Sequence, residues 1–204
     1  MKRLLSIVMM TICLISVTML VSCASTNVSR VSSEAVIDLT GDWNDTDVRL
    51  VCDDLVDACL SSPRLARFEA QNNRLPIVLV GTFRNDSDEH IDTSIITSKM
   101  QNSIINSGRA DFMASNSQRT ETRKEIMNQQ AWSNPDDAKS IANEAAADFM
   151  LQGSVKTIVQ KSGKRSVRTY FVYAELIDIE SGMVIWTGEN DSIKKVVTEA
   201  SVRW

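Results

Sequence analysis

The apolar positions after residue 40 follow a helical period first and a strand-like pattern next. They recur every three or four residues between Asn44 and Pro63, at Val48, Val51, Cys52, Leu55 and Cys59. The polar residues Asn44–Thr46 are suited to cap a helix, and Pro63 ends the pattern, so we predict a first helix there. A loop that contains Leu65 and Phe68 is expected to lead to Pro76–Gly81, a continuous apolar run typical of a buried strand.

A second helix is predicted over Ile91–Ser107, because one side of this segment is apolar and Gly108 follows it, as glycine often does at a helix end. The residues on that side are Ile95, Ile96, Met100, Ser103 and Ile104. Ala110–Ser115 fits a short strand. Two further helices are expected at Gln118–Gln130 and Asp136–Ala147, where Pro135 suits the boundary between them.

Three strands are predicted after these helices, at Phe149–Gln160, Ser166–Ile179 and Met183–Gly188, and short Gly-containing turns join them into hairpins. Both alternating sets of positions in the middle strand are largely apolar, so we expect both of its faces to be covered. An edge strand and a tail should follow over 191–204. The pattern indicates an α/β (α+β-like) fold, a small mixed sheet with flanking helices.

The N-terminus has the layout of a secretory signal. Lys2 and Arg3 precede the apolar run Leu4–Val21, and Leu20-Val21-Ser22-Cys23 matches the bacterial lipobox, which ends at the lipidated cysteine. The alternative is an uncleaved anchor, since about 18 apolar residues suffice to span a bilayer. We predict a signal peptide at 1–22, a lipidated Cys23 with a flexible polar tether at 23–40, and a globular domain at 41–204. Ala24 after the cysteine favours the outer membrane.

Composition narrows the function further. The chain is 43% hydrophobic and 24% charged, with a formal net charge of -4, so it lacks the basic balance of a nucleic-acid-binding protein. It has a single histidine and no motif of a hydrolase or a phosphate-binding loop, so we expect no cofactor, no metal and no enzymatic activity. Cys52 and Cys59 are too far apart on one helix to form a disulfide, which predicts buried thiols. The sequence therefore favours a membrane-tethered binding domain.

Five segments, in order and spacing, resemble the LpoB family of lipoprotein activators of class A penicillin-binding proteins: Asp42–Asp47, Gly81–Asp92, Ser107–Arg109, Ala147–Gly153 and Tyr173–Trp186. The resemblance implies a domain similar to the N-terminal domain of TolB, anchored by acyl chains in the outer membrane and facing the periplasm. It also implies that the protein docks on a noncatalytic domain of the bifunctional peptidoglycan synthase. This docking raises the rates of glycosyl transfer and cross-linking by the synthase. The tether of this chain is short for the family, because the best-studied type of LpoB protein has a long Pro-rich linker.

Two exposed polar segments are the candidate partner contacts, the loop Arg84–His90 and the hairpin Lys164–Tyr170. Their candidate residues are Arg84, Asn85, Glu89, His90, Lys164, Arg165, Arg168 and Tyr170. Ordinary solvated loops are an equally good interpretation of both segments. At the level of function, the alternative is an envelope scaffold or adaptor that binds another outer-membrane or cell-wall component.

Overall fold

The computed structural model describes residues 28–115, 118–125 and 146–199. Contacts divide the chain into a segment that ends at Ala35 and a compact unit that begins at Val36. The compact unit therefore starts inside the segment that was predicted to be a tether up to residue 40.

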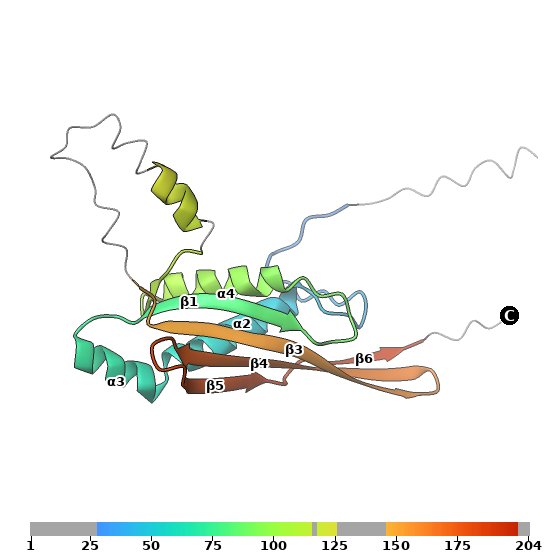
Figure 1. Cartoon of the computed structure of the whole chain (residues 1–204). Coiled ribbons are helices and arrows are strands. Elements are labelled where there is room, and N and C mark those ends of the chain that lie inside the picture. The colour runs from blue at the N-terminus through green and yellow to red at the C-terminus, as the bar shows by residue number, and fades with distance from the viewer. Residues whose placement is uncertain (1–27, 116–117, 126–145, 200–204) are drawn as a thin grey trace, which may run out of the picture. The chain divides into compact units, whose positions relative to one another are not determined.

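Six strands of the described chain form one mixed sheet (Figure 1). Its order is β2-β1-β3-β4-β5, and β6 also pairs with β4. β1 is parallel to β2 and β3, and the other pairs are antiparallel. The strands are β1 (Ile77–Asn85), β2 (Asp111–Phe112), β3 (Phe149–Ser162), β4 (Arg165–Asp178), β5 (Val184–Asn190) and β6 (Lys194–Thr198). The predicted fold class, a mixed sheet with flanking helices, is confirmed.

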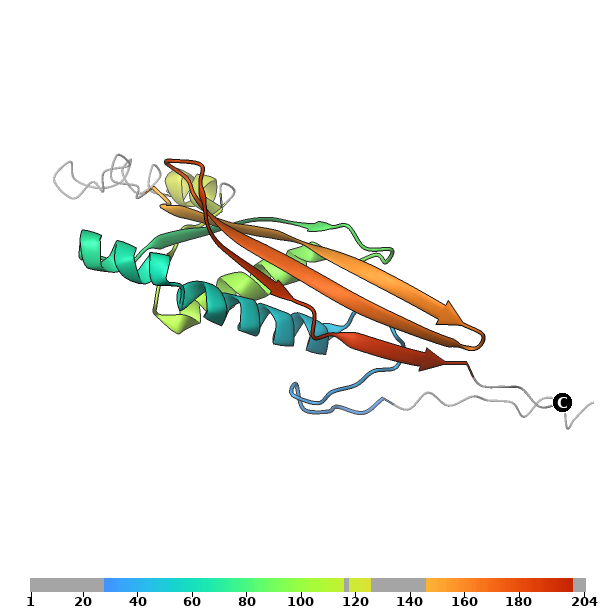
Figure 2. The same cartoon turned by 90° about the horizontal axis from the view of Figure 1, so that it is seen from below.

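Helices α2 (Asp45–Leu60) and α4 (Thr93–Ser107) lie side by side against one face of this sheet (Figure 2). Asn44 caps α2 in a capping box with Asp47, which confirms the predicted helix start. Gly108 ends α4 with a φ of 64°, as predicted from its position. Residues 118–125 are also helical, which fits the first part of the helix predicted at Gln118–Gln130. The helix predicted at Asp136–Ala147 lies almost wholly outside the described residues.

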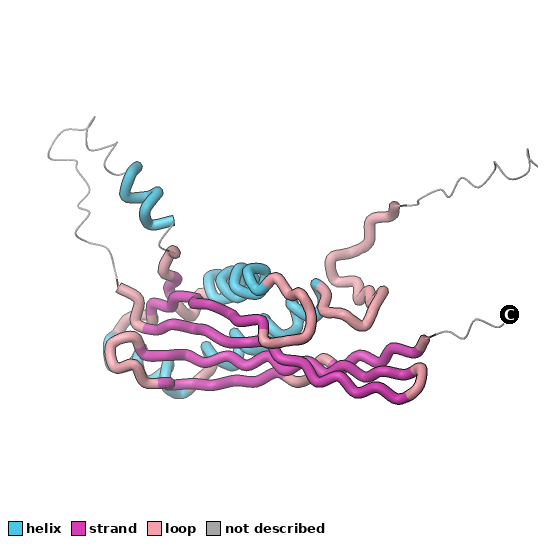
Figure 3. Tube along the Cα trace, turned by 45° about the vertical axis from the view of Figure 1, so that its right-hand side comes forward, coloured by secondary structure: helices cyan, strands magenta, loops and turns pink. Residues whose placement is uncertain are grey.

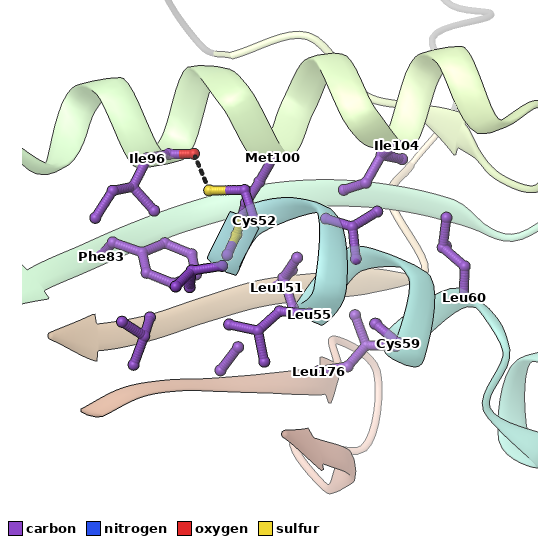
Figure 4. Packing of buried hydrophobic residues seen from close by; sticks show 14 of the residues in the cluster. Cys52, Leu55, Cys59, Leu60, Phe83, Ile96, Met100, Ile104, Leu151 and Leu176 are labelled. Atoms are coloured by element: carbon purple, nitrogen blue, oxygen red, sulfur yellow. Dashed lines mark hydrogen bonds between the residues drawn. The ribbon is translucent and has the colours of Figure 1, made fainter. Parts of the chain in front are cut away.

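The core fills the space between the two helices and the sheet (Figure 4). On β4 the inward side chains are fully buried, at Tyr170, Val172, Ala174 and Leu176. From α4, Ile96, Met100 and Ile104 reach the same core. Cys52 and Cys59 of α2 are buried free thiols, as predicted, and Sγ of Cys52 lies 3.8 Å from the carbonyl oxygen of Ile96.

Three details differ from the sequence-based expectations. Residues 63–72, expected to be a loop, form helix α3 (Pro63–Asn72), in which the proline stands in the first turn and Asn73 adopts a left-handed conformation after the last. Ile95 is 55% exposed because it lies off the buried side of α4. The prediction that both faces of the middle strand are covered is wrong, since Phe171 and Tyr173 stay partly exposed on the face opposite α2 and α4. We call this the outer face.

The predicted hairpins are confirmed. β3 and β4 pair over their whole length around a turn at Gly163, whose φ is 57°, and Gly182 with a φ of 69° lies in the turn before β5. Glycine adopts this region at little cost. The predicted edge strand over 191–204 is β6, and Trp204 lies outside the described residues.

Candidate partner-binding site

The loop after β1 and the β3–β4 hairpin, which lie far apart in the sequence, meet at the carboxylate of Glu89. Oη of Tyr170 donates to Oε1 of Glu89 over 2.6 Å and also lies 3.1 Å from the carbonyl oxygen of Gly41. The backbone N–H of Trp43 donates to Oε2 over 3.0 Å. The guanidinium of Arg168 forms an ion pair with the same carboxylate. Charge-assisted bonds of this kind are the stronger ones, and here they hold three segments together.

A second carboxylate, Asp88, links the loop to both strands of the hairpin. Oγ1 of Thr157 donates to Oδ1 of Asp88 over 2.5 Å, and the backbone N–H of Asp88 donates to Oγ1 of Thr157 over 3.2 Å. Nη1 of Arg168 lies 3.3 Å from Oδ1. The bond from Thr157 and then the nearby charge of Arg168 keep the pKa of Asp88 below its ordinary value, despite some desolvation. The loop is thus anchored on the hairpin.

The predicted contact residues divide into those that hold the loop and those that face solvent. Asn85 is exposed but donates from Nδ2 to the carbonyl oxygen of Glu89 over 2.7 Å and accepts from the N–H of Ser87. The other four exposed residues of the set are Arg84, His90, Lys164 and Arg165. Arg84 lies 3.9 Å from the Asp86 carboxylate in a loose surface pair.

Tyr170 was expected to be exposed, and this expectation is wrong. Its side chain is fully buried because it continues the apolar inner row of β4, and its ring packs 5.1 Å from the ring of Trp43. Burial is the main reason that the pKa of Tyr170 is raised. Tyr170 therefore positions the loop from inside the domain.

A groove of about 550 Å³ lies beside this network, between the starts of α2 and α4. Trp43, Val48, Ile91 and Ile95 supply its apolar lining. Its polar lining consists of Asp42, Asn44, Asp45, Glu89, His90 and Asp92. Asp92 is already engaged as the N-cap of α4, where it accepts from the N–H of Ser94 over 3.0 Å. The groove combines an apolar floor with an acidic rim.

Lys195 of β6 ties the start of the compact unit to the network. Its Nζ lies 2.6 Å from Oδ2 of Asp47 and 2.9 Å from Oδ1 of Asp38, and it donates to the carbonyl oxygen of Asp42 over 2.8 Å. Burial alone would lower the pKa of Lys195, but the bonds to Asp47 and Asp38 outweigh it and raise the pKa. Sequence reasoning missed this residue. Its signal was the alternation of β6, which places one of the two adjacent lysines on the inner face.

Residues in two of the segments that resemble the family form side-chain bonds that connect other parts of the domain. Arg74 forms a two-point ion pair with Asp148, with both N–O distances 2.7 Å. Burial alone would raise the pKa of Asp148. The bonds from Arg74 and from the N–H of Ile77 lower it by more, so the pKa lies below its ordinary value. Arg109, after the end of α4, binds Asp57 and Ser61 of the α2 end. These residues fix the ends of helices and strands.

The described residues include no cluster of three or more histidine, cysteine or acidic side chains that could hold a metal ion. Burial raises the pKa of the Cys52 and Cys59 thiols to about 12, so both are protonated at neutral pH. Cys23 lies outside the described residues, and its lipidation stays a prediction. Within the described ranges, none of the helices combines the length and the apolar composition needed to cross a bilayer.

A family model described as "Peptidoglycan-synthase activator LpoB" matches residues 47–192 of the chain. The chain belongs to the LpoB family. The match begins in the first turn of α2 and ends after β5, so it covers the helices, the Glu89 loop and the hairpin. Membership associates the chain with activation of a peptidoglycan synthase rather than with a catalytic activity.

Solved LpoB structures share limited sequence with the chain. The LpoB C-terminal domain from Salmonella enterica is 17% identical, with 75% of this chain and 99% of that chain covered and a TM-score of 0.42. The corresponding domain from Escherichia coli is 16% identical, with 68% and 95% covered and a TM-score of 0.40. The NMR structure of E. coli LpoB is 14% identical, with 88% and 84% covered and a TM-score of 0.41. None of the curated proteins matches the chain.

Proposed function

We propose that the protein is a lipoprotein, anchored through Cys23 in the outer membrane and facing the periplasm, that binds a class A penicillin-binding protein and activates it. The family match over residues 47–192 carries this proposal, because the family is described by activation of a peptidoglycan synthase. The partner surface on the synthase is its noncatalytic docking domain. The expected effect of the interaction is faster glycosyl transfer and faster cross-linking during cell-wall synthesis.

The structure supports a role in binding through the Glu89 loop. Glu89 and Asp88 receive bonds from both hairpin strands and from the chain segment before α2, so the loop has little freedom to rearrange. A preorganised loop loses less conformational entropy when it binds, which favours affinity. Arg84 and His90 at its surface, with Lys164 and Arg165 at the hairpin tip, are the proposed contacts.

Activation sets a thermodynamic condition on this contact. A ligand shifts a conformational equilibrium only when it binds one state more tightly than the other. The protein must therefore prefer the active conformation of the synthase.

The tether limits where the contact takes place. Residues 24–35 separate the lipidated cysteine from the compact unit, and twelve residues extend at most about 40 Å. The compact unit must therefore begin within about this distance of the outer membrane, and the docking domain of the synthase must extend far enough to reach it.

Co-purification from envelope extract tests the proposed partner. The full chain, tagged after Trp204 and extracted in detergent, should enrich a class A penicillin-binding protein over an unrelated outer-membrane lipoprotein that is handled in the same way. Enrichment of cell-wall fragments or of another lipoprotein, with no synthase, would instead support the scaffold function. Replacement of Cys23 with alanine should remove the protein from the outer-membrane fraction, and unchanged fractionation would contradict the lipid anchor.

A further inference from the structure

The far end of the β3–β4 hairpin forms a three-stranded ribbon with β6 (Figure 3). We define the distal ribbon as residues 156–169 together with β6. Five lysines and arginines lie between residues 156 and 168 with no aspartate or glutamate among them, although the chain as a whole carries a formal net charge of -4. The ribbon therefore concentrates positive charge in an acidic protein.

The cations of the ribbon fall into two groups. Arg168 and Lys195 face inward, where their side chains are only 19% and 10% exposed and pair with the carboxylates described above. The remaining cations are exposed and form no ion pair within the described residues: Lys156, Lys161, Lys164, Arg165 and Lys194. These charges are available to a partner.

The strand register places some of these cations beside apolar side chains on the outer face. Thr169 pairs with Ile158 on one side and with Lys194 on the other, and residues directly opposite each other share a face of the sheet. In the same way Phe171 pairs with Lys156, two residues along β4 from Thr169, and Val167 pairs with Val196. Ile158 is 55% exposed and Val196 is 50% exposed.

An apolar centre with basic groups around it is the composition of a protein-binding surface, since the apolar part gains from burial and the charged rim selects the partner. We propose that the outer face of the distal ribbon is the docking surface for an acidic surface of the partner protein. This inference rests on the proposed function and deepens it, because it adds Lys156, Ile158, Lys194 and Val196 to the proposed contacts and gives the charge of the opposing surface.

A protein surface fits this face better than a lipid bilayer. Ile158 and Val196 have short, branched side chains, and the lysine side chains that share this face with them are longer. Apolar groups that bind membranes must enter about 5–10 Å into the interface. Side chains this short, beside longer charged ones, do not reach that depth, whereas a side chain that projects from a protein partner can contact them.

The test compares two charge-reversed forms of the full chain in detergent. Lys156→Glu with Lys194→Glu changes the outer face, and Arg64→Glu with Arg67→Glu changes two exposed arginines of α3 by the same total charge. Binding kinetics to a purified class A penicillin-binding protein are measured at low and high salt. The first variant should associate at least about tenfold more slowly at low salt and lose most of the salt dependence, while the α3 variant stays within about twofold of wild type. Thermal unfolding checks that both variants are folded.

Each other outcome overturns the inference in a distinct way. Wild-type binding that neither variant alters leaves the proposed function intact but refutes the docking surface, and an equal loss in both variants shows that only overall charge matters. A wild-type chain that binds no synthase refutes the proposed function, and the docking surface with it. Vesicles that contain phosphatidylglycerol form a separate arm. If the first variant loses only the additional vesicle binding that phosphatidylglycerol gives over neutral lipid, and keeps synthase binding, the ribbon contacts membrane rather than protein.

Discussion

Individual side chains decide how the loop that contains Glu89 is held, and Glu89 itself makes several of the bonds. Its carboxylate receives a phenol, a backbone N–H and a guanidinium while its side chain remains only 13% exposed. A buried carboxylate is tolerated when such donors surround it. The sequence singled out Glu89, Arg168 and Tyr170 as surface residues, because polar character alone does not show that a loop and a hairpin will meet.

Removal of one of these donors should weaken the domain. Tyr170→Phe deletes the hydroxyl that donates to Glu89, and we expect the free energy of unfolding to fall by about 2 kcal/mol, the usual range for a bond to a charged group. Urea denaturation of the full chain measures it. Tyr173→Phe is the matched control, since its Oη donates to Glu175 over 3.1 Å on the outer face, and it should cost less. Equal losses in the two variants would contradict the assignment of Tyr170.

Buried protonated groups predict a loss of stability at alkaline pH. Burial raises the pKa of Cys52 and Cys59 from 9.0 to about 12, so the unfolded chain releases these protons at a lower pH than the folded chain. Their contribution is fully present below pH 9 and is lost as pH rises toward about 12, at up to about 1.4 kcal/mol per thiol per pH unit.

Chemical denaturation at several pH values above 8 measures this slope. Cys52→Ala with Cys59→Ala should be less stable at pH 7 because it leaves cavities, yet it should lose less stability between pH 9 and 12. Tyr170, Tyr173 and Lys195, whose pKa values are also raised, contribute to the remaining alkaline loss. A double variant with the full wild-type slope would contradict the burial of the thiols.

Whole elements could be predicted where local signals agreed with the tertiary environment. The β3–β4 hairpin was predicted because two long apolar strands flank a turn with glycine. Helix α3 was missed because only Leu65 of its ten residues is buried, so the apolar pattern is weak. Its signals were Pro63 at the start and Asn73 after the end. Coverage of the outer face could not be predicted, since alternation does not show which face receives helices.

Lys195 connects β6 to the start of α2, and its loss should affect both elements. Lys195→Met leaves the carboxylate of Asp47, only 5% exposed, without its cation, and we expect a loss of about 3–5 kcal/mol in unfolding free energy. Lys99→Met is the control, because its pair with Asp53 is more exposed and should contribute about 0–1 kcal/mol. Hydrogen exchange should show reduced protection of β6 in the first variant alone.

A second change separates the pair from the lysine itself. Asp47→Asn in the Lys195→Met background removes the uncompensated charge, so the double variant should recover part of the lost stability. Additive losses would show that Lys195 acts through its aliphatic stem and not through Asp47.

At the scale of the whole molecule, charge is distributed unevenly between the helices and the ribbon. Helix α2 carries Asp45, Asp47, Asp53, Asp54 and Asp57, whereas every charged residue of the distal ribbon is a cation. This separation was present in the sequence, but its meaning depended on the register that places Lys156 and Lys194 on one face. The fold class and the family were predictable from pattern and motifs, while the pairing that brings Lys156 and Lys194 to one face was not.

The decisive experiment for activation is the glycosyl-transfer rate of a purified class A penicillin-binding protein, measured with and without the full chain. We expect a higher rate that saturates as the chain is added, and a weaker response to the form with Lys156→Glu and Lys194→Glu than to the form with Arg64→Glu and Arg67→Glu. A rate that stays the same at saturating amounts of bound chain would contradict the claim that this protein is an activator.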